Sequence, residues 1–275
     1  MSGDGPGRMA GQTALIAGGT GGIGMAAGLR FVEEGARVVV AGLSVEDVER
    51  VNDGPRAGPR FRGVQAEVAD PASVSRMFEE ALGMLGGRLD VLVHVAGISA
   101  RKYGDGPLHE CSEEGWDAAL SVNARGCFLT NRAAVRIMLD QPAGPVRGSI
   151  VNVGSVLAHS HAPHFFGTCG SSASKAAVRA LTLGSAARYA ADRIRFNLVE
   201  PGLIDTPMAA RAVGNPAIRR YLQAKQPLTG GPGTPRDVAE AILFLAEPST
   251  SFLTGVVVNA DGGWCVSEGA IGAET

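Results

Sequence analysis

The stretch "AGGTGGIG", residues 17–24, decides the fold of this 275-residue chain. It follows the apolar run "TALIA" and leads into an alanine-rich segment that starts near Ile23. Glycines at this spacing allow a tight turn and the close approach of a pyrophosphate, and the next helix offers free N–H groups at its positive N-terminus. A tight turn that binds nothing is the alternative. The candidate phosphate-binding residues here are Gly18, Thr20, Gly22, Ile23 and Gly24.

Short β-branched runs alternate with helical stretches along the rest of the chain. Further strands are predicted at "ARVVVAG", "RFRGVQAEV", "DVLVHVAG", "GSIVNVGS", "IRFNLVEPG" and "GVVVNADGG". About seven parallel strands with crossover helices predict a single-domain, doubly wound (Rossmann-like) α/β fold over residues 11–275. We expect residues 1–10 to be disordered, residues 206–230 to form a lid, and residues 214–233 to be rich in loops.

Composition restricts the partners. Lys and Arg number 25 against 27 Asp and Glu, for a net charge of −2, so there is no broad basic field for nucleic acid or an anionic membrane. We therefore expect a small-molecule substrate. No apolar run approaches the length of a bilayer span and the N-terminus does not resemble a signal peptide, which predicts a cytoplasmic protein. Scarce lysine beside abundant arginine is typical of GC-rich bacterial genomes.

The four cysteines are Cys111, Cys127, Cys169 and Cys265. They lie far apart in the sequence and form no CxxC pair. This spacing favours reduced thiols over a disulfide framework or a zinc site. From the sequence we expect no metal.

Several motifs, in order, resemble those of the short-chain dehydrogenase/reductase family. They are the glycine turn at 18–24, "HVAG" at 94–97, Asn123 in "SVNARGCF", Ser155 in "IVNVGS", Lys175 in "SASK", Asn197 in "IRFNLVEPG", "PGLIDTPM" at 201–208 and "DGG" at 261–263. The resemblance covers nearly the whole chain. It implies hydride transfer between nicotinamide C4 and a carbonyl or alcohol carbon, and assembly as a homodimer or homotetramer.

The family uses a catalytic tetrad of Asn, Ser, Tyr and Lys. By position, the resemblance implies that Asn123 holds a water in a proton relay, Ser155 bonds the substrate oxygen and Lys175 holds the nicotinamide ribose. The tyrosine position is occupied by Ser171. A phenol with a reference pKa near 10, lowered by the neighbouring lysine, is the family's general acid/base. An aliphatic hydroxyl is a far weaker acid on a shorter side chain, although Ser171 still shares a helix face with Lys175.

No other tyrosine replaces the missing one by a small shift of the alignment. Tyr189 lies further along the same predicted helix, out of reach. Tyr103 follows the fourth strand and Tyr221 lies in the predicted lid, so both are expected in exposed loops that can border a cleft.

Three histidines, His159, His161 and His164, lie between Ser155 and Ser171, in a segment about three residues longer than the family's usual spacing. An imidazole could take over the proton transfer, or the segment could be a polar loop at the edge of the cleft. A zinc site is disfavoured because no carboxylate or cysteine completes it at ligand spacing.

The end of the second strand leaves NAD versus NADP undecided. Gly42 stands where an acidic residue grips a ribose hydroxyl, while Leu43 and Gly21 stand where basic residues bind a 2′-phosphate. Ser44 could bond either group, so the cofactor is written NAD(P). The remaining cofactor candidates are Ser44, Glu67, Val68, Ala96, Gly97, Lys175, Pro201, Gly202, Ile204 and Thr206. For Glu67 a solvated charge at a strand end is an equal alternative.

Two functions follow. The first is an NAD(P)-dependent oxidoreductase of ketoreductase type, in which Ser171 is either an inactivating replacement of tyrosine or part of an atypical site whose proton comes from a histidine, Tyr103 or water. The second is a non-redox protein on the same scaffold, such as a dehydratase, a cyclase or a cofactor-binding assembly module. The catalytic candidates are Asn123, Ser155, Ser171 and Lys175.

Overall fold

The computed structural model describes residues 7–142 and 144–268. Its centre is a parallel sheet of seven strands in the order β3-β2-β1-β4-β5-β6-β7. The strands are β1 (Thr13–Ala17), β2 (Arg37–Gly42), β3 (Phe61–Gln65), β4 (Val91–His94), β5 (Gly148–Val153), β6 (Ile194–Pro201) and β7 (Val257–Ala260). All seven predicted strands and the single-domain, doubly wound α/β class are confirmed.

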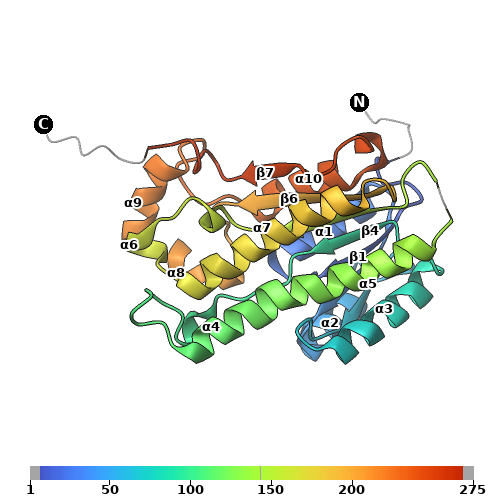
Figure 1. The fold of residues 1–275 in the computed structure, drawn as a ribbon, viewed down its shortest axis with the longest axis horizontal. Coiled ribbons are helices and arrows are strands. Elements are labelled where there is room, and N and C mark those ends of the chain that lie inside the picture. Colours follow the sequence, from blue (N-terminus) through green and yellow to red (C-terminus); the bar gives the residue numbers. More distant parts are fainter. Residues whose placement is uncertain (1–6, 143, 269–275) are drawn as a thin grey trace, which may run out of the picture.

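Helices cover both faces of this sheet (Figure 1). Helix α1 packs against α10 on one face, and α3, α5 and α7 cover the other. The helices are α1 (Gly22–Glu33), α2 (Val45–Asn52), α3 (Pro71–Leu85), α4 (Glu113–Ala119), α5 (Gly126–Asp140), α6 (Pro163–Phe166), α7 (Cys169–Tyr189), α8 (Ala210–Val213), α9 (Pro216–Lys225) and α10 (Pro235–Ala246). Short turns of other helix types are η1 (Ala100–Tyr103), η2 (Leu120–Arg125), η3 (Val156–Ala158), η4 (Pro207–Ala209) and η5 (Pro248–Thr250).

The strands form because both faces of the sheet are buried. Successive residues of β1 enter different cores: Ile16 packs with the α1 and α10 side, and Leu15 with the α3 and α5 side. Strands buried on both faces read as continuous apolar runs, which explains why the sequence located them well. Strand β1 lies between β2 and β4, so the winding reverses there, and the crevice at the carboxyl ends of these strands is where such sheets bind ligands.

Two segments differ from the prediction. Within the stretch 1–10, residues 1–6 lie outside the described residues, but Met9 is fully buried and its N–H donates to Glu34 O at 3.0 Å. An apolar side chain in this core ties down a segment that its glycines made look disordered.

The segment expected to be rich in loops contains α9. Asn215 accepts bonds from the N–H groups of Ala217 and Ile218, and Pro216 takes the first helical position. Asn followed by Pro is a helix-start signal that the sequence analysis missed. Tyr221 is therefore on a helix and not in an exposed loop, with its ring 5.2 Å from that of Phe165. Burial raises its pKa.

In the part of the chain that the structure describes, no helix has both the length and the apolar character needed to cross a bilayer.

Candidate active site

The glycine turn after β1 forms a cradle that a larger residue would fill. A Cβ at Gly18, where φ is +83°, would lie 2.5 Å from Ala96 N, and a Cβ at Gly24 would lie 2.1 Å from Gly18 O. Gly21, the N-cap of α1, makes no side-chain cap bond, so no cap side chain occupies the N–H groups of the first turn. A pyrophosphate fits such free donors at a positive helix end.

The end of β4 approaches this turn and the catalytic candidates together. The N–H groups of Val95 and Ala96 both donate to Ala17 O, at 2.8 and 2.9 Å. At Gly97 a Cβ would lie 3.1 Å from Asn123 Oδ1 and 3.4 Å from Lys175 Nζ. The structure thus brings the predicted residues of three distant segments into contact.

Asn123 lies in η2, a π-helical turn between α4 and α5. Turns of this kind occur frequently at functional sites. The side chain is 1% exposed; its Oδ1 accepts from Ile98 N at 2.8 Å, and its Nδ2 donates to Ser174 Oγ at 2.9 Å. These bonds hold Asn123 in one orientation against the segment after β4.

Lys175 and Ser155 both lie at the carboxyl end of β5. Lys175 Nζ donates to Val153 O at 3.0 Å, two residues before Ser155. Burial lowers the pKa of Lys175, partly offset by the nearby Cys127 thiol. Ser155 is half-buried, and its Oγ accepts from Leu157 N at 3.2 Å, which starts η3.

Ser171 is bound by a carboxylate that the sequence did not reveal. Its Oγ donates to Asp105 Oδ2 at 2.6 Å, and its N–H donates to the same oxygen at 2.8 Å. Gly170 N donates to Asp105 Oδ1 at 2.9 Å. Asp105 is 4% exposed and caps the N-terminus of α7 from a loop far away in the sequence. No spacing rule links the two segments, so only the tertiary structure could identify this contact.

At the carboxyl end of β2, Thr20 fills the space next to Gly42. A Cβ at Gly42 would lie 2.1 Å from Thr20 Oγ1, which leaves no room there for the acidic residue that would bind a ribose hydroxyl. Ser44 accepts from Asp47 N at 3.2 Å and donates to Glu46 at 2.6 Å, so it caps α2.

Glu67 and Val68 support the local chain. Glu67 Oε1 accepts from Ala69 N at 3.0 Å, and its own N–H donates to Ser73 Oγ at 2.9 Å. Val68 is buried, and a Cβ at Gly126 would lie 2.8 Å from its Cγ2. Both therefore have structural contacts, and their roles toward a cofactor remain predictions.

The loop after β6 has one residue facing the glycine turn. A Cβ at Gly22 would lie 3.3 Å from the Thr206 methyl group. Pro201 and Ile204 are instead buried, and Gly202 N donates to Ala260 O at 3.1 Å. Of these four predicted cofactor residues, Thr206 is the one that these contacts place against the glycine turn.

The three clustered histidines do not converge. His159 Nδ1 lies 3.4 Å from Glu200 and its Nε2 lies 3.5 Å from Cys265 Sγ. His164 is exposed and packs edge-on against Phe165, and His161 is exposed. The HxHxxH arrangement therefore forms no metal site among the described residues.

A fourth histidine, His94, was noted in the sequence only as part of the "HVAG" motif, and its side chain was given no role. It is 1% exposed at the end of β4, with Nδ1 2.9 Å from Thr130 Oγ1 and no partner for Nε2. Burial, together with the charge of Lys175, lowers its pKa to about 3. His94 is thus neutral, and its low pKa indicates that the interior beside Lys175 excludes water.

Comparisons with known proteins agree with this geometry. A family model described as enoyl-(acyl carrier protein) reductase matches residues 17–265. The chain belongs to the short-chain dehydrogenase/reductase family, whose members are NAD(P)-dependent oxidoreductases.

Individual relatives cover nearly the whole chain. It is 38% identical to cis-4-hydroxycyclohexanecarboxylate dehydrogenase of Sinomonas cyclohexanicum, over 92% of this chain and 96% of the relative. It is 36% identical to 3-oxoacyl-[acyl-carrier-protein] reductase FabG of Thermotoga maritima, over 93% and 98%. It is 34% identical to 2,5-dichloro-2,5-cyclohexadiene-1,4-diol dehydrogenase LinX of Sphingobium indicum, over 94% and 98%.

Proposed function

We propose that this protein binds NAD(P) and transfers hydride between nicotinamide C4 and a carbonyl or secondary-alcohol carbon. The observation that supports this most directly is the packing of Gly97 against Asn123 Oδ1 and Lys175 Nζ. The residues that would hold the cofactor are those of the glycine turn, Gly97, Lys175 and Thr206. When bound, the nicotinamide supplies or accepts the hydride.

The proton requires a different source from the family's phenol. Ser171 donates its hydroxyl hydrogen to Asp105 at 2.6 Å and is therefore engaged away from a substrate. Lys175 uses one of its three donors on Val153 O, which leaves two for a ribose and a water. Its pKa is lowered by burial, which brings the ammonium closer to exchanging a proton near neutral pH. We assign the exchangeable proton to Lys175 Nζ, with water in the space that a phenol would fill.

The substrate in this proposal carries an anionic group. Arg101, in η1, donates to Phe165 O at 3.3 Å. Burial and the positive charge of Arg211, in α8, lower the pKa of Arg101, while Asp105 opposes the shift. The effect of the Arg211 charge on Arg101 indicates that the two guanidinium groups repel each other, and an anion between them would relieve this repulsion. The name of the cyclohexanecarboxylate relative fits such a substrate.

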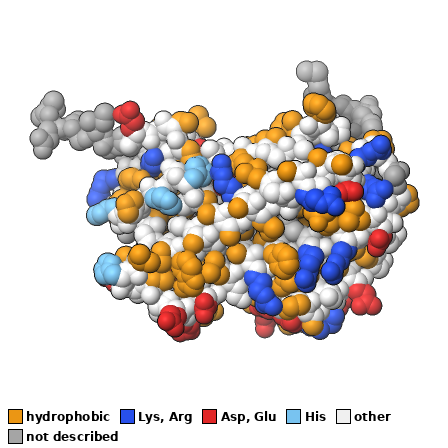
Figure 2. Space-filling model, in the orientation of Figure 1, with side chains coloured by type: hydrophobic (Ala, Val, Ile, Leu, Met, Phe, Trp, Pro, Cys, Tyr) orange, Lys and Arg blue, Asp and Glu red, His pale blue; other side chains and the backbone are white. Residues whose placement is uncertain are grey.

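We also propose that the protein assembles as a homo-oligomer through helix faces. Figure 2 shows hydrophobic side chains gathered over α4, α5 and α7. On these three helices, the exposed large hydrophobic residues are Trp116 at 39%, Phe128 at 42% and Leu183 at 36%. Clustered apolar exposure of this kind is typical of interaction surfaces.

The second candidate is a non-redox protein that binds NAD(P) without turnover. The observation that favours it is the Asp105 carboxylate, which accepts bonds from both the hydroxyl and the N–H of Ser171. A residue so engaged acts as a helix cap and supplies no acid.

The test follows NADH and NADPH oxidation over a panel of cyclic ketones, with cofactor binding measured by nicotinamide fluorescence. General acid/base catalysis contributes about 10²–10⁴-fold, so Ser171→Tyr is expected to raise kcat by about 10²-fold or more. Ser171→Phe, which has the ring without the hydroxyl, is the matched control. Lys175→Met should abolish the residual turnover of the original protein. Cofactor binding with no turnover in the original protein and in Ser171→Tyr would favour the non-redox function.

The anionic substrate is tested with 4-oxocyclohexanecarboxylate and neutral 4-methylcyclohexanone. Arg101→Gln should raise KM about 10-fold for the carboxylate alone. An equal change for both ketones would contradict the role of Arg101.

A further inference from the structure

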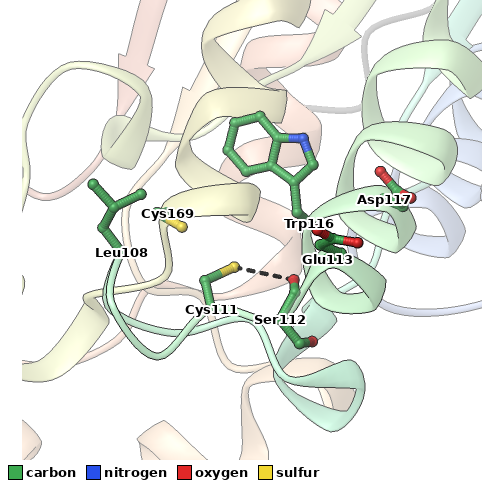
Figure 3. A pocket seen from close by; sticks show the side chains of 7 residues that line it. All are labelled: Leu108, Cys111, Ser112, Glu113, Trp116, Asp117 and Cys169. Carbon is green, nitrogen blue, oxygen red and sulfur yellow. Dashed lines mark hydrogen bonds between the residues drawn. The ribbon is translucent and has the colours of Figure 1, made fainter.

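A compact group of three potential metal ligands lies at the N-terminus of α7, although the sequence predicted no metal. Asp105, Cys111 and Cys169 each place one ligand atom within 4.8 Å of the others. Asp105 and Cys111 belong to the loop between η1 and α4, and Cys169 is the first residue of α7. Figure 3 shows the Cys111 and Cys169 side chains approaching each other across this boundary.

Asp105 has one acceptor position that α7 does not use. A carboxylate offers about four such positions. Ser171 occupies two on Oδ2 through its N–H and hydroxyl, and Gly170 N–H occupies one on Oδ1. The fourth, on Oδ1, accepts from the Cys111 thiol at 3.7 Å, and a metal ion would take the place of this thiol proton. Hydrogen bonds that fix a ligating carboxylate in this way are a regular feature of metal sites.

The charge at this point also favours a cation. Two thiolates and a carboxylate together would carry three negative charges, and a divalent ion would balance two of them. The remaining charge lies at the first turn of α7, whose partial positive charge stabilises anions.

The ligand set and its surroundings select the metal. Thiolate sulfur with one carboxylate oxygen suits Zn²⁺ in tetrahedral geometry, and three protein ligands leave the fourth position open. That position has access to solvent through a cavity of about 350 Å³ lined by Leu108, Cys111, Ser112, Glu113, Trp116, Asp117 and Cys169 (Figure 3). Glu113 and Asp117 add negative charge to its wall, which attracts a cation.

We propose that Asp105, Cys111 and Cys169 form a Zn²⁺ site with an exchangeable water as fourth ligand. Because Asp105 also binds Gly170 and Ser171, the ion fastens the loop before α4 to the start of α7, the helix that carries Lys175. The site does not depend on the proposed hydride transfer. It is a structural clamp beside the position where the family's tyrosine is missing.

The test uses protein stripped with a chelator, reduced, and titrated with Co²⁺ as a spectroscopic probe. We expect one Co²⁺ per chain, with thiolate-to-cobalt charge-transfer absorption that Zn²⁺ abolishes by displacement. Cys111→Ser and Cys169→Ser should each weaken binding by more than about 100-fold, beyond the cost of losing an outer partner. Cys265→Ser, which removes a partly exposed thiol outside the group, is the matched control and should bind normally.

A second measurement needs no variant and guards against misfolding. In the original protein, Zn²⁺ should protect Cys111 and Cys169, but not Cys265, from alkylation. Absence of the charge-transfer band, or its persistence in the Cys111→Ser/Cys169→Ser protein, would overturn the proposal. So would a Cys111–Cys169 disulfide in the protein as isolated, with both thiols untitratable and no metal bound.

Discussion

Helices α1 and α7 both begin at the carboxyl edge of the sheet, but their N-termini are used in opposite ways. At α1 the N-cap is Gly21, whose lack of a side chain leaves the first N–H groups uncapped. At α7 the N-cap Thr168 makes no cap bond either, but Asp105 accepts from Gly170 and Ser171. One positive helix end is kept open for an external anion, and the other is closed by an internal carboxylate.

This difference separates the predicted cofactor-binding turn from the position predicted for the general acid/base. The α1 turn retains the glycines that a pyrophosphate requires. At the α7 terminus, the Ser171 hydroxyl donates to Asp105, which lies beside two cysteines. Cofactor binding and proton supply can therefore be disturbed independently.

The largest effect is expected at the uncapped N-terminus of α1. Gly24→Ala places a Cβ 2.1 Å from Gly18 O, and backbone cannot move aside cheaply. Overpacking of this kind costs about 1–3 kcal/mol in shifted backbone. If the pyrophosphate binds only to the unshifted turn, binding must restore that geometry, and since every 1.4 kcal/mol is tenfold in affinity, NAD(P)H binding should weaken by up to about 100-fold. Fluorescence titration measures it. Gly21→Ala, whose Cβ meets nothing within 4 Å, is the control, and equal losses in both variants would contradict the prediction.

The N-terminus of α7, which Asp105 caps, is tested by Asp105→Ala. This change leaves two N–H groups and the Ser171 hydroxyl without their acceptor and should lower the free energy of unfolding by about 2–3 kcal/mol. Urea denaturation with a chelator present measures it. In a double-mutant cycle with Ser171→Ala, a coupling energy near zero would show that the Ser171–Asp105 bond contributes nothing.

The exclusion of water at the end of β4 is tested through the pKa of His94. Its pKa is about 3 in the folded protein, against 6.5 for an ordinary histidine. The unfolded chain therefore gains a proton first as the pH falls, and stability present above pH 6.5 is lost toward pH 3. At pH 5 the loss should be about 2 kcal/mol. Urea denaturation at pH 7.5 and pH 5 should show a smaller drop for His94→Asn; an unchanged drop would place the cause elsewhere.

The smallest effect concerns Ser44, which the sequence assigned to cofactor binding and the structure shows capping α2. Ser44→Ala should lower the free energy of unfolding by about 1 kcal/mol. If the hydroxyl serves only the helix, the ratio of NADH to NADPH affinity should not change. Thr234→Ala, which removes the cap of α10, is the control for a cap remote from the cofactor candidates. If the ratio of NADH to NADPH affinity changes in Ser44→Ala but not in Thr234→Ala, Ser44 contacts the cofactor as the sequence predicted.

Much of the fold could be read from the sequence because its strands are buried on both faces and so appear as apolar runs. Helix α9 was missed because glycines and prolines on both sides of it made residues 214–233 look like a loop, although Asn215 and Pro216 marked its start. Met9 was missed because one buried side chain does not change the composition of a glycine-rich segment. Local sequence patterns indicate which helices and strands are buried along their length. They do not reveal a contact made by one buried side chain.

For the candidate site, the sequence by itself located the glycine turn, and the family resemblance of its motifs predicted catalytic positions at Asn123, Ser155, Ser171 and Lys175. These follow from motifs in which neighbouring residues act together. Only the tertiary structure decided that Asp105 holds Ser171 and that Cys111 meets Cys169. The physical reason is that these contacts join the loop before α4 to the start of α7, and folding, not sequence spacing, brings those segments together.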